Sequence, residues 1–117
     1  MGLVRGMAYL RKEDETVEMD YSLSRVWMTI QKVLTALKWN LEMVDDANHK
    51  IRAKTTAGPM SFGSILLIEA VQVNENTTRV SVASETPVTT ITAIFDFAQG
   101  KRRIANFLAE LAKQLTS

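Results

Sequence analysis

Apolar residues recur at steps of three and four between Ser22 and Leu41. This period predicts one amphipathic helix over the whole segment. Ser22 stands where an N-cap belongs, because its hydroxyl can accept a hydrogen bond from a first-turn N–H, and Asp20 lies just before it, near the positive end of the helix dipole. Strand-like segments on both sides predict a sheet that buries the apolar stripe. The stripe consists of Leu23, Val26, Trp27, Ile30, Val33, Leu34 and Leu37.

Alternating apolar and polar residues predict strands elsewhere in the chain. Turn residues at 45–48 and 74–76 join four of these strands into two hairpins. Residues 3–11 suggest an edge strand or a mobile arm, and the charged cluster at 12–15 predicts a turn. In the segment from Ser64 to Val73 apolar residues fall on both faces, which predicts cover on both sides of that strand. The predicted strands are 16–21, 40–44, 49–56, 64–73 and 77–85.

A second helical pattern begins at Asp96, which with Gln99 has the spacing of a capping box. Residues 89–95 before it are rich in β-branched residues and form either extended chain or the lead-in to the helix. The order of elements is β-α-β-β-β-β-α. We therefore predict an α+β fold, a two-layer sandwich in which two helices pack an antiparallel sheet of about five strands. The stripe of the second helix consists of Phe97, Ile104, Phe107, Leu108, Leu111 and Leu115.

Composition indicates a single folded domain over residues 1–117, since 46% of the residues are hydrophobic and 23% are charged. The 14 Lys and Arg nearly balance the 13 Asp and Glu, so we expect no nucleic-acid partner. The chain has no cysteine, which excludes disulfides and zinc sites of the thiolate type. We expect no transmembrane segment. As the sequence stands we expect a cytoplasmic location, or the cell envelope if a signal segment has been removed.

Short segments spread over most of the chain carry a resemblance to known proteins. They are residues 6–9, 22–27, 36–39, 51–53, 78–82, 103–104 and 107–108. This pattern resembles small domains of unknown function in bacterial envelope lipoproteins, more loosely the helix-grip repeats of the outer-membrane assembly lipoprotein BamC, and more distantly the START-like ligand-binding folds. The resemblance implies an α+β fold and a structural role in a cell-envelope assembly. It implies no site residue, because the matching positions are of core or turn type.

Candidate catalytic or metal chemistry is sparse. Asp45, Asp46 and His49 could ligate a metal, but two turn-forming aspartates and a solvent-facing histidine explain the same residues, and we favour the turn. We therefore predict no metal and no cofactor. His49 is the only histidine, and the nucleophile-elbow pattern G-x-S-x-G is absent. On these grounds we predict that the protein is not an enzyme.

Two basic groups stand out. Lys50, Arg52 and Lys54 alternate with less polar residues, so their side chains should project from one face of a strand. They form either an anion or lipid-headgroup patch or a solvated strand face that resists edge pairing, and we favour the solvated face. For the run from Lys101 to Arg103 we likewise favour solvation over anion binding.

Large apolar residues suggest a groove between the sheet and the C-terminal helix. Met60, Phe62, Phe95 and Phe97 are its candidate lining, with the loop at 58–63 as a movable rim, although such residues equally well fill an irregular core. Our leading hypothesis is a small non-enzymatic binding or protein-interaction module. Its partner would be a small apolar ligand or another protein, with a homo-oligomer as a close variant. A structural accessory of a cell-envelope assembly and anion or lipid-headgroup binding are the alternatives.

Overall fold

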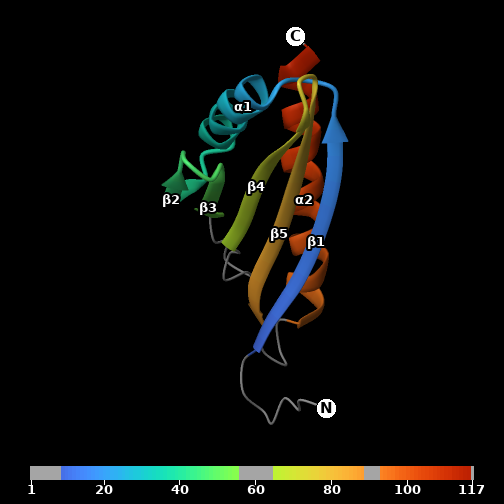
Figure 1. Cartoon of the computed structure of the whole chain (residues 1–117). Coiled ribbons are helices and arrows are strands. Elements are labelled where there is room, and N and C mark those ends of the chain that lie inside the picture. Colours follow the sequence, from blue (N-terminus) through green and yellow to red (C-terminus); the bar gives the residue numbers. More distant parts are fainter. Residues whose placement is uncertain (1–8, 56–64, 89–92, 117) are drawn as a thin grey trace.

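A computed structural model describes residues 9–55, 65–88 and 93–116 of the chain (Figure 1). One antiparallel sheet has the strand order β1-β5-β4-β3-β2, and both helices contribute to a single core on one face of it. This confirms the predicted two-layer α+β sandwich and its β-α-β-β-β-β-α order. The elements are β1 (Tyr9–Met19), α1 (Leu23–Ala36), β2 (Asn40–Asp45), β3 (Lys50–Lys54), β4 (Ile65–Asn74), β5 (Thr77–Val88) and α2 (Ala93–Thr116).

The start of α1 is as predicted, and its end is not. The Ser22 hydroxyl accepts a hydrogen bond from the backbone N–H of Arg25 at 3.3 Å, which makes Ser22 the N-cap. The helix ends at Ala36 because Lys38 adopts a positive φ of 61° and turns the chain back, so that the backbone N–H of Trp39 donates to the carbonyl of Leu34. The predicted helical segment and the predicted strand at 40–44 overlapped at residues 40–41, and the structure assigns these two residues to β2.

The predicted turn at 12–15 is also wrong, because β1 runs without interruption for 11 residues and pairs with β5 along its whole length. β1 is an edge strand, where charged side chains remain in water and discourage pairing with another chain. On its outer face Glu18 forms an ion pair with Arg79 at 3.0 Å. Residues 9–11 belong to this edge strand, while residues 3–8 lie outside the described residues.

The second helix begins three residues before the predicted capping box. α2 starts at Ala93, so Asp96 lies within its first turn. Of the two expectations for residues 89–95, extended chain or the lead-in to the helix, the second fits residues 93–95, which form the start of α2. The Arg25 guanidinium of α1 donates to the carbonyl oxygen of Leu115 at 2.7 Å and thereby fixes the C-terminal end of α2. None of the described helices is long and apolar enough to cross a membrane. The buried residues of α2 are Ile104, Phe107, Leu111 and Leu115.

The two faces of the sheet differ in cover. The inner face packs against the helices and its apolar residues are buried, whereas Val71 and Val73 on the outer face are each 43% exposed. The expected cover on both sides of the strand from Ser64 to Val73 is therefore wrong for its part at Val71 and Val73. The buried apolar residues of the inner face are Ile51, Ala53, Leu66, Ile68, Ala70, Val80 and Val82.

The turn between β2 and β3 is attached to α1 by one aromatic side chain. The indole N–H of Trp27 donates to Asp46 Oδ1 at 2.9 Å, and the His49 ring meets the Trp27 ring edge-on with centroids 5.1 Å apart. Asp45 accepts hydrogen bonds from the Asn48 amide side chain at 2.9 Å and from the backbone N–H groups of Asn48 and Ala47. These bonds favour the charged carboxylate, and the Asn48 side chain contributes most to holding the pKa of Asp45 below its ordinary value.

Removal of one buried side chain of α1 tests the assignment of its inner face. Leu34 is fully buried, so Leu34→Ala should lower the free energy of unfolding by about 2 to 5 kcal/mol. Lys32 is exposed on the same helix, and Lys32→Ala should change it by less than about 0.5 kcal/mol. Chemical denaturation measures both values. Equal costs for the two variants would contradict the assigned face.

The hydrogen bonds to Asp45 predict a dependence on pH. A lowered pKa means that Asp45 contributes stability above its unfolded value of about 3.8 and that this contribution is lost as the pH falls through the lower folded value. Asn48→Ala should therefore raise the pKa of Asp45, as followed by an NMR titration of the carboxyl carbon. Asn74→Ala, in the β4–β5 turn, is the control and should leave it unchanged. An unaltered pKa in Asn48→Ala would contradict the assigned cause.

Candidate functional site

The helices cover the inner face of the sheet unequally. β5 has 12 residues and extends for about 40 Å, whereas the 14 residues of α1 span about 21 Å. α1 lies near the C-terminal end of α2, and the N-terminal half of α2 runs beside the lower ends of β1 and β5 (Figure 1). Near those lower ends α2 is thus the helix that faces the sheet.

Side chains on the inner face become smaller and more polar toward this lower end. Ile51, Ile68 and Val82 form one cross-strand row, since Ile68 pairs with both of the others. In the next inward row the corresponding residues are Ala53, Leu66 and Ser84. Ser84 is 1% exposed, and its hydroxyl oxygen has no hydrogen-bond partner. Buried hydroxyl groups almost always have one, so this position needs an explanation.

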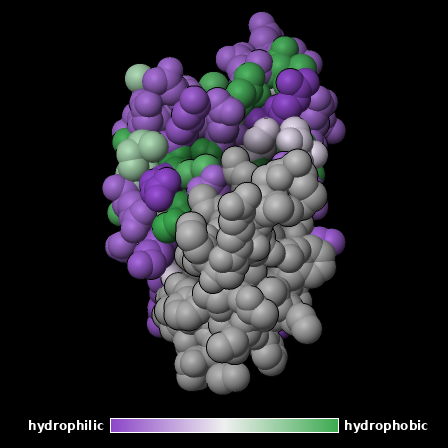
Figure 2. All heavy atoms as spheres, turned by 90° about the horizontal axis from the view of Figure 1, so that it is seen from below, coloured by the Kyte–Doolittle hydropathy of each residue, from purple (hydrophilic) through white to green (hydrophobic). Residues whose placement is uncertain are grey.

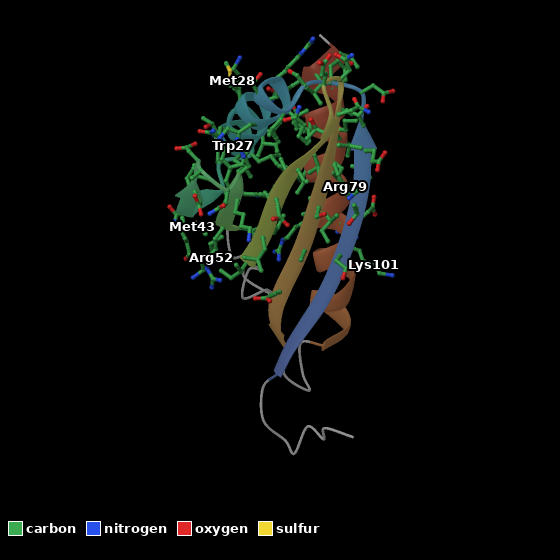
Figure 3. All side chains as sticks on the ribbon, viewed as in Figure 1. Trp27, Met28, Met43, Arg52, Arg79 and Lys101 are labelled. Atoms are coloured by element: carbon green, nitrogen blue, oxygen red, sulfur yellow. The ribbon has the colours of Figure 1, made fainter. Side chains whose placement is uncertain are left out.

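A cavity of about 510 Å³ lies between β1 and α2, and this volume is typical of pockets for small molecules. Thr16 and Glu18 contact outward-facing residues of β5, so by the alternation of the strand Glu15 points to the inner side. Lys101 lies on α2 beside β1 (Figure 3). Apolar helix residues and ionisable groups therefore meet at one site. The described lining is Asp14, Glu15, Lys101, Ile104 and Ala105.

A second hollow, of about 300 Å³, lies on the outer face of the sheet. Its floor is formed by the small residues Ser81 and Ala83 of β5, between longer side chains of the neighbouring strands. At its rim Lys50 pairs with Glu69 at 3.7 Å. This hollow is the smaller of the two and lies on the face without a helix, so the cavity beside α2 is the better candidate for a ligand.

The predicted groove residues fall largely outside the described part of the chain. Met60 and Phe62 lie outside the described residues. Phe95 and Phe97 belong to the first half of α2, which runs along the lower end of the sheet, but their side chains lie outside the description. The structure thus contains a cavity beside α2, and its lining by these four residues stays a prediction.

The predicted basic face has acidic neighbours. Lys50, Arg52 and Lys54 are all exposed and alternate with buried residues of β3, as the pattern predicts. Arg52 forms an ion pair with Glu42 at 3.1 Å, in addition to the pair between Lys50 and Glu69. Part of the positive charge is therefore compensated on the protein itself, and anion binding here stays a prediction.

The residues that we considered as metal ligands have other contacts. Asp45 accepts hydrogen bonds within its own turn, Asp46 accepts the Trp27 indole N–H, and His49 packs on the Trp27 ring. His49 is partly buried in this contact and does not face solvent freely as expected. Among the residues that the structure describes, no group of three or more His, Asp or Glu side chains could hold a metal ion.

Ser84 was missed by the sequence analysis. Its position could have been read from the alternation in β5, because Val80, Val82 and Ser84 are successive residues of one face. The unpartnered hydroxyl, in contrast, depends on tertiary packing. The sequence analysis also did not place Glu15 and Lys101 at one site, since they belong to elements at opposite ends of the chain.

Comparison with known proteins identifies the fold of the chain but not its family. No protein-family model matches the sequence, and no curated protein matches it. Among solved structures, norcoclaurine synthase from Thalictrum flavum is similar with a TM-score of 0.72 at 10% identity, over 97% of this chain and 98% of that chain. The Zhui aromatase/cyclase from a Streptomyces strain is similar with a TM-score of 0.66 at 13% identity, over 90% and 93% of the two chains. A conserved protein from Geobacillus kaustophilus has a TM-score of 0.54 at 12% identity, over 91% and 95%.

These similarities correct two expectations. They support the helix-grip part of the predicted resemblance and give no support to its envelope-lipoprotein part. The prediction that the protein is not an enzyme is wrong as an inference from missing motifs, because norcoclaurine synthase and the aromatase/cyclase are enzymes on this same fold. At identities of 10% to 13% the likeness concerns the fold alone. The chain has the helix-grip fold, which also occurs in enzymes.

Proposed function

We propose that the protein binds a small, largely apolar molecule in the cavity between β1 and α2. The observation that carries this proposal is the cavity of about 510 Å³ between the middle of β1 and α2. A solved structure of norcoclaurine synthase, which is similar with a TM-score of 0.71 at 10% identity, holds dopamine and hydroxybenzaldehyde. That protein thus binds small aromatic molecules on the same fold, which supports a ligand of comparable size here.

The described lining combines the charged residues Asp14, Glu15 and Lys101 with a smaller apolar part. Ile104 is buried at the wall of the cavity, and Ala105 presents only a methyl group. A two-ring aromatic molecule that buries about 250 Å² of apolar surface gains about 6 kcal/mol, which corresponds to dissociation constants of tens of micromolar before ordering costs.

Filling the cavity should prevent binding. Ala105 lines the cavity and is exposed, so Ala105→Trp places an indole ring in the space without replacing a core residue. We expect it to weaken the binding of Nile red, an uncharged apolar dye, at least about 10-fold while the melting temperature stays within a few degrees. Dye fluorescence measures the affinity.

The neighbouring Asn106 is the matched control. It is also exposed on α2 and is not among the residues that line the cavity, so Asn106→Trp should bind the dye as the wild type does. Equal affinity of wild type and Ala105→Trp would contradict the proposed location. Absence of dye binding to the wild type would contradict the proposed function.

Self-association through β2 is a second proposal, and the exposure of this edge strand favours it. Leu41 and Met43 are 40% and 45% exposed, and β2 is the last strand of the sheet. Met43 lies at the margin of the molecule in Figure 3, and hydrophobic atoms are visible on that side in Figure 2. Unpaired backbone groups beside apolar side chains favour pairing between two copies.

Sedimentation velocity tests this second proposal. We expect a dimer at concentrations of about 100 μM, as for a weak protein–protein interface. Met43→Glu should convert the dimer to a monomer, because the new charge would be buried between the two strands. Met28→Glu is the control, since Met28 is 59% exposed on α1, and it should not change the oligomeric state. A monomeric wild type would contradict the proposal.

A further inference from the structure

Two rows of cross-strand partners cross the outer face of the sheet. The outward side chains of the first row are Asp14 of β1, Ala83 of β5, Leu67 of β4 and Arg52 of β3. Those of the second row are Thr16, Ser81, Glu69 and Lys50. All of these except Arg52 line the outer hollow of about 300 Å³. The hollow is thus built from outward side chains of four strands.

Charge changes sign across this face. Asp14 lies at the β1 side, is exposed, and has no ion-pair partner among the described residues. The outward residues of β3, at the other side, are all basic and exposed, and the ion pairs with Glu42 and Glu69 compensate only part of their charge. An acidic group therefore lies at one side of the face, and an excess of positive charge lies at the other.

Side-chain size also changes across the face. In the first row a methyl group, that of Ala83, lies beside the much larger side chain of Leu67. Both residues are half-buried, so Leu67 still presents apolar surface outward. Ala83 and Ser81 form the floor of the hollow, which leaves room there for a side chain from another molecule. The face thus carries a projection and a recess side by side.

A two-fold axis along the strands, between β4 and β5, makes this face complementary to itself. Such an axis sets β1 of one copy opposite β3 of the other, and β5 opposite β4. Leu67 of each copy then lies over Ala83 of the other. Asp14 lies opposite Arg52 of the second copy, because both belong to the same row. Sheets that pack face to face interdigitate their side chains in this way.

The charges select this axis over the other two-fold arrangement of the same faces. An axis across the strands would set β1 on β1 and β3 on β3. The basic side chains of β3 would then face each other, and like charges across an interface cost several kcal/mol. The axis along the strands pairs opposite charges instead. Charge complementarity thus favours one occupant, a second copy of this chain in one orientation.

The available area is sufficient for a weak dimer. Strands lie about 4.8 Å apart and outward rows about 7 Å apart, so four strands and four rows give about 500 Å² per copy. The two copies together bury about 1,000 Å², which is the lower limit for a specific interface.

We infer that two copies of the protein pack the outer faces of their sheets together about a two-fold axis along the strands. This dimer goes beyond the proposed ligand binding and does not depend on it. It also uses a different surface from the pairing of β2 edges, because here the contact is made by the faces of β1, β5, β4 and β3.

Reversal of one charge pair tests the inference by sedimentation equilibrium. Arg52→Asp places a carboxylate opposite Asp14 of the second copy and should weaken the dimer at least about 10-fold, and Asp14→Arg should do the same. The double variant with both substitutions restores opposite charges and should recover the wild-type dissociation constant to within about 3-fold. The single and the double variant both lose the pair with Glu42, so their difference reports the contact with residue 14.

Filling the hollow is an independent test that leaves the charges unchanged. Ala83→Gln places a longer side chain where Leu67 of the second copy would lie, and it should also weaken the dimer at least about 10-fold. Circular dichroism and the melting temperature check that each variant folds. Arg102→Asp is the matched control for the charge reversal, since Arg102 is exposed on α2, and it should leave the dissociation constant unchanged.

A dimer that persists at wild-type strength in Arg52→Asp, Asp14→Arg and Ala83→Gln would overturn the inference. If Met43→Glu alone dissociated that dimer, the contact would be the β2 edge. A double charge variant that stayed monomeric would overturn the assigned two-fold axis. A monomeric wild type would overturn both dimers, whereas ligand binding in the cavity beside α2 is tested separately by the dye.

Discussion

The difference in length between the elements governs this structure. The hairpin of β4 and β5 offers an inner face of about 40 Å, and the 14-residue α1 covers about half of that length. The 24 residues of α2 span about 36 Å and are long enough to follow the whole sheet. The fold therefore has one end that two helices pack and one end that faces a single helix. The candidate site lies between the middle of β1 and α2.

The doubly packed end is fixed by specific contacts between the helices. Arg25 of α1 binds the carbonyl of Leu115 near the end of α2, and its guanidinium lies 4.7 Å from the centre of the Tyr21 ring. Trp39, just after α1, stacks on Phe107 of α2 with ring centroids 6.4 Å apart. These contacts bury the aromatic and aliphatic residues that give most of the stability. The other end is free to differ in size and polarity without loss of the core.

Local patterns predicted the parts of the fold that depend on local forces. The N-cap at Ser22 and the alternation in β3 and β5 were readable because each depends on neighbouring residues. The strand at 16–19 was predicted as well, but the continuity of β1 through residues 12–15 was not, since these charges look like a turn until β5 supplies a partner strand. The end of α1 was missed because Lys38 adopts a positive φ that is uncommon for a residue other than glycine.

The candidate site was less predictable than the fold, for a related reason. Alternation in β5 places Ser84 on the buried face, but only the packed structure shows that its hydroxyl has no partner. Glu15 of β1 and Lys101 of α2 line the same cavity, and no spacing in the sequence indicates that these two residues lie close together. The predicted lining by Phe95 and Phe97 came from residue type alone and stays a prediction, because the side chains of both lie outside the described part of α2.

The same separation of residues explains why missing motifs are a poor guide to activity in this fold. General acid–base chemistry needs a proton-transferring group, such as an imidazole, a carboxylate or an amine, within hydrogen-bonding reach of the bound molecule, and it does not require that such groups be close in sequence. Asp14, Glu15 and Lys101 line the cavity, so a molecule bound there lies beside groups of these types. A motif search sees none of this, because β1 and α2 meet only after folding. The enzymes among the structural neighbours are consistent with that conclusion, and turnover of a bound molecule therefore has to be assayed at the same site as binding.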